Sequence, residues 1–402
     1  MGSNYKKLGP YIQVVNERNS NLNGNKLLGV SIRKCFMTSI ANTIGTDMST
    51  YKLIKKNQFA YGPVTSRNGD KISVALLDEY ENGLVSQAYV VFEIIDINEL
   101  DPEYLMMWFR RPEFDRYARF KSHGSAREIF DWSEMCDTEL PIPSIEKQRE
   151  IVKEYNTIVN RITLNEKLNQ KLEETAQAIY KQWFVDFEFP NEEGKPYKSN
   201  GGKMVWCEEL EKEIPEGWKI VFLDEICKKT YGYPFDSNLF TNQDQNNVPL
   251  IRIRDILNGY SDIYTSEKVD TKYLLQNGDL LIGMDGSFHM SIWYNDVAYL
   301  NQRVVKFRPL TESLSNLQVL FSIWDQIKDF ENNIHGTTVA HLSDKHLKEI
   351  YFIIGNEENQ KKTTSIFNKI IRNVIKIKKE NLKLIELKNL ILAKMTGGEK
   401  LI

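Results

Sequence analysis

Two long stretches of the chain place apolar residues at every third or fourth position, which is the pattern of an amphipathic helix. The first stretch carries the seam Ile151, Tyr155, Ile158, Ile162, Asn169, Leu172 and Ile179. The second carries Phe367, Ile370, Val374, Asn381, Leu384 and Ile391. This spacing is that of a heptad seam. Because neither helix can leave such a stripe in water, we expect the two helices to pack together as an antiparallel coiled coil.

Asn169 and Asn381 occupy equivalent places in the middle of the two seams. A polar residue in a coiled-coil seam lowers stability but fixes the register and orientation of the partner helix. The alternative is that both side chains face water because the helices curve away from each other at this point. The sequence leaves both interpretations open.

An internal repeat organises the chain around these helices. The tripeptide His-Gly-Ser at 123–125 recurs 212 positions later as His-Gly-Thr at 335–337. At the same offset Gln148 matches Gln360, and the helical patterns align without a gap. The match continues upstream more loosely. A repeat of this length indicates a duplicated structural unit, so we expect two copies of a strand-rich module, each followed by a long helix.

The modules are expected to mix helices and strands. Short apolar runs bounded by turn residues, such as 248–253 and 279–283, are typical of strands, whereas the aromatic spacing of 317–330 predicts a helix with a core face. The predicted fold is α+β, with two mixed α/β modules in a pseudo-twofold repeat separated by two long antiparallel coiled-coil helices. The expected boundaries are 1–145 for the first module, 146–189 for the first helix, 190–212 for a linker, 213–356 for the second module and 357–402 for the second helix.

Composition narrows the range of functions. The 402 residues carry a net charge of −3. A basic domain is the usual footprint of nucleic-acid binding, so any DNA binding must depend on local charge or on partners. The four cysteines form no Cys-x-x-Cys pair, which argues against a zinc site or a disulfide framework. The chain shows neither a signal peptide nor an apolar run long enough to span a bilayer, so we expect a cytoplasmic protein without a membrane segment.

One segment carries a family resemblance. Residues 140–152, Leu-Pro-Ile-Pro-Ser-Ile-Glu-Lys-Gln-Arg-Glu-Ile-Val, resemble the proline-containing strand end and following helix of specificity (S) subunits of type I restriction–modification enzymes. Ile-Pro-Glu-Gly-Trp-Lys at 214–219 and Gly-Asp-Leu-Leu at 278–281 are similar to further motifs of this family. The second copy departs from the pattern, because Ile-Ile-Gly-Asn at 353–356 replaces the Pro-x-Pro.

The resemblance implies that the modules are two target-recognition domains. It implies a non-catalytic DNA-recognition subunit that reads a bipartite, non-palindromic target in double-stranded DNA. It also implies assembly with two methyltransferase subunits and with motor-nuclease restriction subunits. S-adenosylmethionine, ATP and magnesium would then belong to those partners, and this chain would hold no cofactor or metal of its own.

The candidate DNA contacts are polar residues at matched points of the repeat, because bases are read by hydrogen-bonding side chains in loops or groove-entering elements. In the first module they are Arg33, Lys34, Ser66, Arg67, Asn68, Lys121, Ser122, Ser125 and Arg127. In the second they are Arg252, Arg254, Ser287, His289, Arg303, Thr337, Thr338 and Lys345. Each of them alone is equally consistent with an ordinary surface residue.

Two other classes of function remain open. Glu193-Gly194-Lys195 has the tail of a metal-dependent nuclease motif, so a stand-alone sequence-specific nuclease is the main alternative. It lies in a polar linker, and the chain has neither an adenine-methylation motif nor a phosphate-binding loop. A structural protein that dimerises through its helices is the third possibility. The presence of two differing modules favours the binding protein, because an enzyme needs no second, divergent copy.

Overall fold

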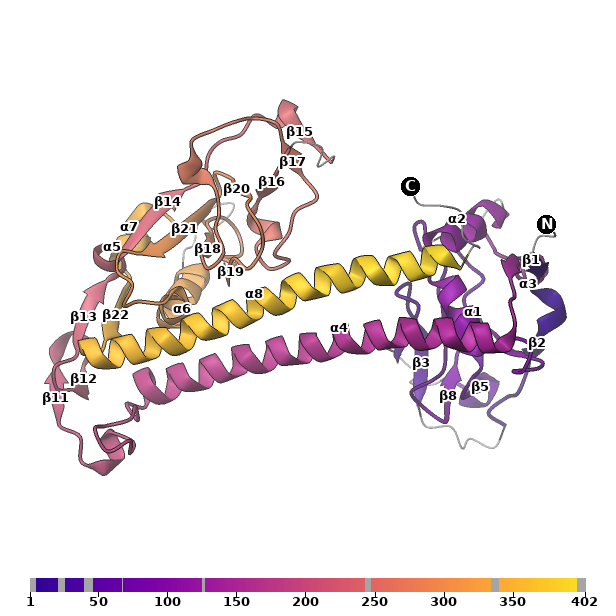
Figure 1. The fold of residues 1–402 in the computed structure, drawn as a ribbon, viewed down its shortest axis with the longest axis horizontal. Helices are drawn as coiled ribbons and strands as arrows, with labels where there is room; N and C mark the ends of the chain where they lie inside the picture. Colours follow the sequence, from indigo (N-terminus) through magenta and orange to yellow (C-terminus); the bar gives the residue numbers. More distant parts are fainter. Residues whose placement is uncertain are drawn as a thin grey trace. The chain divides into compact units, whose positions relative to one another are not determined.

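The computed structural model describes residues 5–20, 26–39, 46–66, 68–124, 127–242, 247–333 and 340–395. The chain forms two compact units, coloured by sequence in Figure 1. The first unit combines Met1–Ile162 with Lys383–Ile402, and the second comprises Thr163–Leu382. Each unit therefore contains one module and a part of both long helices. No helix in the described ranges is both long and apolar enough to cross a membrane.

The described residues of the first unit form two four-stranded sheets and three short helices. One sheet has the order β2 (Ile12–Val15), β9 (Val90–Ile94), β6 (Phe59–Tyr61) and β7 (Val74–Leu76). The other has the order β4 (Phe36–Thr38), β3 (Leu27–Val30), β8 (Asn82–Val85) and β5 (Lys52–Lys55). A strand pair joins β1 (Tyr5–Lys7) to β10 (Glu139–Pro141). The helices are α1 (Pro102–Phe109), α2 (Pro112–Lys121) and α3 (Trp132–Cys136).

Helix α1 is the centre of this module. The Asp101 carboxylate caps it by accepting the N–H groups of Glu103 (2.9 Å) and Tyr104 (3.0 Å). Every residue from Tyr104 to Phe109 is buried. The helix packs on the sheet whose rings Phe59 and Phe92 stack at 4.8 Å. An all-round apolar helix of this kind is stable only inside a core.

The second unit repeats this architecture. One sheet has the order β14 (Cys227–Tyr231), β21 (Val304–Pro309), β18 (Leu280–Gly283) and β19 (Met290–Ile292). The other has the order β15 (Phe240–Thr241), β17 (Tyr264–Thr265), β16 (Val248–Ile251) and β20 (Tyr299–Leu300). Two strand pairs join β13 (Lys219–Phe222) to β22 (Tyr351–Ile354) and β11 (Met204–Cys207) to β12 (Lys212–Pro215). The helices are α5 (Leu223–Ile226), α6 (Asn316–Asn333) and α7 (Asp344–Glu349).

The strand registers show that the two modules are copies. In the first unit β9 lies between β2 and β6, and in the second β21 lies between β14 and β18, with every pair antiparallel. The other sheets share a parallel pair, β3 with β8 and β16 with β20. This agreement confirms the α+β fold with a duplicated module that the sequence predicted.

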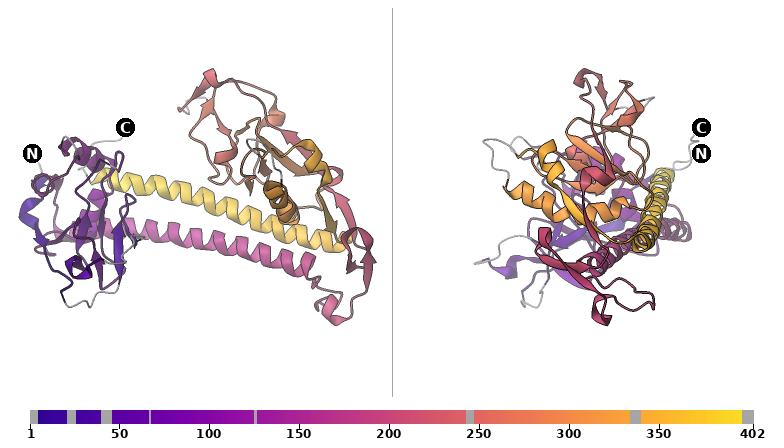
Figure 2. Two further views of the ribbon diagram at one scale, coloured as in Figure 1. Left: turned by 180° about the vertical axis from the view of Figure 1, so that it is seen from behind. Right: turned by 90° about the vertical axis from the view of Figure 1, so that its left-hand side faces the viewer.

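The two long helices are α4 (Ile145–Tyr180), which continues into a π-turn at Lys181–Val185, and α8 (Glu357–Lys394). Within each unit they lie side by side (Figures 1 and 2). In the first unit Tyr155 of α4 shares a core with Met395 at the end of α8. In the second unit Ala176 shares a core with Phe367 near the start of α8. The helices are therefore antiparallel, and every expected seam residue is buried or half-buried.

The polar centre of the seam is asymmetric. Asn381 accepts a hydrogen bond at 2.8 Å from the amide of Asn165, one turn before the residue expected from the repeat. Asn169 is only 9% exposed, and its Oδ1 is buried without a hydrogen-bond partner among the described residues. The interpretation in which Asn169 and Asn381 both face water is therefore wrong.

A buried glutamine ties the start of each long helix to its own module. Gln148 of α4 is fully buried; its Oε1 accepts the N–H of Asp101 (2.9 Å) and its amide donates to the carbonyl of Pro143 (2.8 Å). Its repeat counterpart Gln360 of α8 is also buried and exchanges hydrogen bonds with Gln318 of α6. The matched glutamines therefore have a structural role.

Candidate nucleic-acid interface

Each unit has an edge at which loops from distant parts of the chain are joined by the same backbone contacts. In the first unit residues 63–65 pair with 128–130 through two hydrogen bonds of 2.8 and 3.0 Å and an isolated antiparallel bridge. In the second unit residues 284–286 pair with 340–342 through two bonds of 2.8 and 2.9 Å and an equivalent bridge. The backbone pairing of the two loops therefore contributes to the shape of each.

A glycine shapes one of these loops in the first unit. Gly124 has φ +140°, and a Cβ at this position would lie 2.1 Å from the carbonyl oxygen of Arg127. His123 and Ile129 exchange backbone hydrogen bonds of 3.1 and 2.9 Å around it. The turn therefore requires the residue without a side chain, which explains the glycine of the His-Gly-Ser sequence.

Two further loops complete the edge in the first unit. They are the turn 31–35, which follows β3, and the turn 86–89, which precedes β9. Tyr89 connects them to the strands, because its hydroxyl accepts the N–H of Val30 at 3.4 Å and its ring lies beside Gly62. The four loops are therefore neighbours although they come from four parts of the sequence.

The same two loops exist in the second unit. Residues 252–259 follow β16, and the N–H of Asn301 donates to the carbonyl of Ile251 at 3.1 Å. The N–H of Met284 donates to the carbonyl of Arg303 at 3.0 Å. The loop before β21 thus joins the end of β16 to the end of β18.

About half of the residues proposed from the sequence lie on these edges. In the first unit they are Arg33, Ser66, Asn68 and Arg127, and in the second Arg254, Ser287, His289 and Arg303. All except Asn68 and His289 are exposed, and those two are half-buried. Arg67, Ser125, Thr337 and Thr338 lie outside the described residues.

Lys34 has a structural position instead. Its side chain is 6% exposed and its ammonium pairs with the Asp115 carboxylate at 2.7 Å. It also donates to the carbonyl of Phe109. Burial lowers the pKa of the Lys34 ammonium, although the hydrogen bond to Asp115 opposes that shift. Lys34 anchors the turn that exposes Arg33, and its ammonium is not available to a phosphate in this structure.

Of four other predicted DNA contacts, three are engaged in hydrogen bonds or ion pairs within the protein, and the fourth lies outside the loops. Lys121 pairs with Glu134 at 3.0 Å, and Ser122 is buried and donates to a carbonyl one turn earlier in α2 at 2.7 Å. Arg252 is held by Asp255 at 2.8 Å. Lys345 is exposed on α7, outside the four loops. Lys121 and Ser122 are thus engaged within their own module and Lys345 lies apart, whereas Arg252 begins the loop 252–259 but is paired with Asp255.

Sequence reasoning missed one group on the second edge. Asp285 contacts two basic side chains: His341 Nδ1 is hydrogen-bonded to its Oδ1 at 2.6 Å, and Arg303 Nη1 forms an ion pair with its Oδ2 at 3.0 Å. Of these three residues only Arg303 was among the predicted contacts, and an aspartate is not an obvious DNA contact. Only the pairing of the two loops shows that these residues meet.

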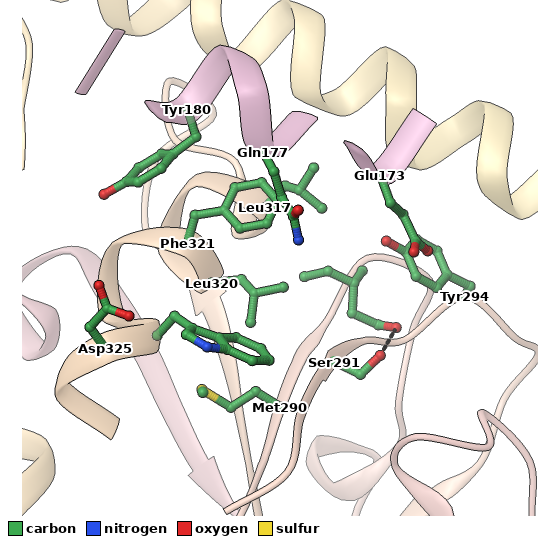
Figure 3. Close-up of a pocket in the computed structure, with 12 residues that line it drawn as sticks. Glu173, Gln177, Tyr180, Met290, Ser291, Tyr294, Leu317, Leu320, Phe321 and Asp325 are labelled. Carbon is green, nitrogen blue, oxygen red and sulfur yellow. Dashed lines mark hydrogen bonds between the residues drawn. The ribbon is translucent and has the colours of Figure 1, made fainter. Parts of the chain in front are cut away.

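A separate pocket of about 410 Å³ lies between α4 and α6 of the second unit. Figure 3 shows Gln177 of α4 beside Leu317 and Phe321 of α6, and Glu173 of α4 beside Tyr294. Phe321 and Trp324 belong to the aromatic stripe of 317–330, so the pocket is a gap at the margin of that helix and not part of the loop edge.

The linker shows no catalytic arrangement. Glu193 and Lys195 pair with each other at 2.9 Å, and their side chains are 70% and 60% exposed. Within the described part of the chain, no group of three or more His, Cys, Asp or Glu side chains is placed to hold a metal ion. These residues therefore give the nuclease alternative no structural support.

Comparison with known proteins identifies the family. The family model described as type I restriction modification DNA specificity domain matches residues 18–174 and 215–387, one copy in each half of the chain. The chain belongs to this family. The resemblance stated from residues 140–152 is thereby confirmed, and the specificity-domain family consists of DNA-recognition subunits without a catalytic role of their own.

Named relatives agree with the family model. The MjaIX specificity subunit of Methanocaldococcus jannaschii is 26% identical over 309 residues, covering 74% of this chain and 68% of the relative. The HindI specificity subunit of Haemophilus influenzae is 24% identical over 415 residues, covering 87% of both. The crystal structure of a type I S subunit from M. genitalium has a TM-score of 0.60 at 14% identity, covering 98% of this chain and 96% of that one. The structural likeness supports the fold.

Proposed function

We propose that this specificity-domain protein reads DNA through the two loop edges, one half-site for each unit. The observation that carries the proposal is the repeated frame, in which the same backbone contacts join equivalent loops while the side chains on them differ. Rigid backbone with variable exposed side chains is the usual construction of a recognition surface. Arg33 and Arg127 in the first unit, and Arg254 and Arg303 in the second, supply phosphate or guanine contacts.

The target that follows from this proposal is bipartite and non-palindromic. Two identical readers would recognise two identical half-sites, but side chains at equivalent positions of the two edges differ, as Val64 does from Asp285 and Ile129 from His341. The unread gap between the half-sites would be determined by α4 and α8, which are continuous over 36 and 38 residues. Each helix would thus act as a spacer between recognition modules.

Catalysis would come from partners. The net charge of −3 leaves little electrostatic attraction for DNA, so affinity would depend on two methyltransferase subunits bound to this chain. Apolar side chains on the outer faces of the long helices, Leu168 (46% exposed), Ile385 (39%) and Leu390 (42%), are available to them. Motor-nuclease subunits would add cleavage. S-adenosylmethionine, ATP and magnesium would bind these partners, and the assembly would act in the cytoplasm.

Methylation mapping tests the proposal. The chain is co-expressed with its methyltransferase subunits, and the modified motif is read by sequencing the host DNA. We expect one motif with two unlike halves and a fixed gap. Exchange of the Arg33 turn should alter one half only, and exchange of the Arg254 loop the other. A palindromic motif, or an exchange that alters both halves together, would contradict the assignment of one half-site to each unit.

A further inference from the structure

Asp285, Arg303 and His341 form a compact group on the edge of the second unit. The side chain of Asp285 is 25% exposed, and its two carboxylate oxygens pair separately with Arg303 and His341. The side chains of Arg303 and His341 are 57% and 51% exposed. The half-buried carboxylate of Asp285 thus holds the exposed guanidinium of Arg303 and the exposed imidazole of His341 close together at the surface.

The backbone under this group is rigid. Asp285 and His341 face each other in an antiparallel bridge, and the carbonyl of Arg303 accepts the N–H of Met284. Residues that are 56 positions apart therefore have a fixed separation. Side chains ordered before binding lose less conformational entropy when a ligand arrives.

The hydrogen-bonding pattern of the group is defined by Asp285. A carboxylate only accepts, so in the neutral imidazole the proton sits on Nδ1 of His341 and Nε2 is left as an acceptor. Arg303 has five N–H donors, of which one faces Asp285. The group therefore offers a forked donor next to an acceptor.

This pattern is complementary to one base pair. In the major groove a G·C pair presents the N7 and O6 acceptors of guanine beside the N4 amino donor of cytosine. An arginine pairs with the guanine edge, and an acceptor takes the cytosine amino group. An A·T pair places a donor between two acceptors and adds a methyl group, which the same arrangement does not match.

The first unit has no such group on its copy of the frame. The registers place Val64 at the position of Asp285, Ala88 at that of Arg303 and Ile129 at that of His341. All three are apolar, and Ile129 is 37% exposed. Apolar side chains are suited to contact a thymine methyl group. The charged group is therefore particular to the second unit.

We infer that Asp285, Arg303 and His341 read a single G·C pair in the half-site of the second unit, with Asp285 as a positioning residue that touches no base. The inference rests on the proposed function and specifies the base pair and the residues that recognise it. Arg303 donates to guanine, His341 Nε2 accepts from cytosine, and Asp285 fixes the separation and tautomer on which both contacts depend.

The test uses the full chain assembled with its methyltransferase subunits. Methylation rates are measured on duplexes in which each pair of the mapped target is replaced in turn. We expect D285N, R303A and H341A each to reduce discrimination at the same G·C pair by about tenfold to a hundredfold, and to leave the other half-site unchanged. K345A is the control, because Lys345 is an exposed residue of the same unit outside the loops.

The possible results separate the alternatives. Unchanged discrimination in R303A and H341A, relaxation at two different pairs, or relaxation at an A·T pair would overturn the inference while the proposed function stands. If the wild-type assembly shows no sequence preference, both fail. Thermal melting of each variant controls for folding. If D285N unfolds, R303A and H341A still test the inference, because the side chains of Arg303 and His341 are exposed and their removal leaves the core intact.

Discussion

The asymmetric polar centre of the long helices gives a sharp prediction about stability. Replacing Asn165 by leucine removes the amide that bonds Asn381 and leaves the carbonyl oxygen of Asn381 without its donor. Asn165 is 2% exposed and Asn381 is half-buried, so water only partly replaces the lost partner. Leaving a buried polar group unsatisfied costs about 1–3 kcal/mol, and we expect N165L to lower the free energy of unfolding by about that amount.

Asn169 supplies a matched control one turn away. Its Oδ1 is already buried without a partner among the described residues, so N169L removes an unsatisfied group and adds apolar surface to the seam. We expect N169L to be neutral or to raise the free energy of unfolding by about 1 kcal/mol. Two identical substitutions in one helix should thus act in opposite directions.

The single variant N381L and the double variant N165L/N381L complete a double-mutant cycle with N165L and the wild-type protein. Both polar partners are then replaced by apolar groups, which is nearly neutral or stabilising when the shapes pack. We expect most of the loss in N165L to be recovered, which gives a coupling energy of about 1–2 kcal/mol between the two positions.

Urea unfolding of the full chain, followed by circular dichroism at the helix band, measures the wild-type protein and the four variants. A larger loss in N169L than in N165L, or additive losses in the double variant, would show that the Asn165–Asn381 bond does not stabilise the seam. The reasoning about the polar centre would then be refuted.

Three further predictions follow from other features. K34M should lower the free energy of unfolding by about 3–5 kcal/mol, because it leaves the Asp115 carboxylate buried without its cation; urea unfolding measures it, with R33M as the exposed control. The isolated chain should bind DNA weakly, and adding methyltransferase subunits should tighten binding and steepen its salt dependence; tight, salt-sensitive binding by the chain alone would contradict this. Removing one heptad from each helix, residues 165–171 and 377–383, shortens each helix by about 10.5 Å. The gap between the half-sites should then change by about three base pairs, while both half-sites persist. Methylation mapping measures the gap, and a changed half-site would show that the helices are not spacers.

The repetitive part of this protein was readable from the sequence. A heptad seam is a local pattern, because the period of the helix relates residues three and four apart without information from the rest of the chain. The offset of 212 positions linked the helix starts, and the duplicated sheets, one with equal strand order and the other with a shared parallel pair, confirmed the fold class. The family resemblance was equally local, since it depended on a short segment at a strand end and the following helix.

Exposure of the candidate contacts depended on tertiary structure. Arg33 and Lys34 are neighbours with the same charge, yet one is exposed and the other is buried against Asp115. Lys34 has φ +62°, a left-handed conformation that the sequence does not signal. The partner that buries its ammonium lies on α2, about eighty residues away. Local composition therefore could not distinguish the two.

Tertiary structure also decided which residues meet. The repeat pointed to Asn169 as the counterpart of Asn381, but the register of α4 against α8 pairs Asn381 with Asn165. That register follows from the packing of both helices along their length, and one seam residue does not reveal it. His341 and Asp285 meet only because two loops pair their backbones. Periodicity determined the repeated frame of this protein, whereas packing between distant segments determined the side chains that the frame presents to DNA.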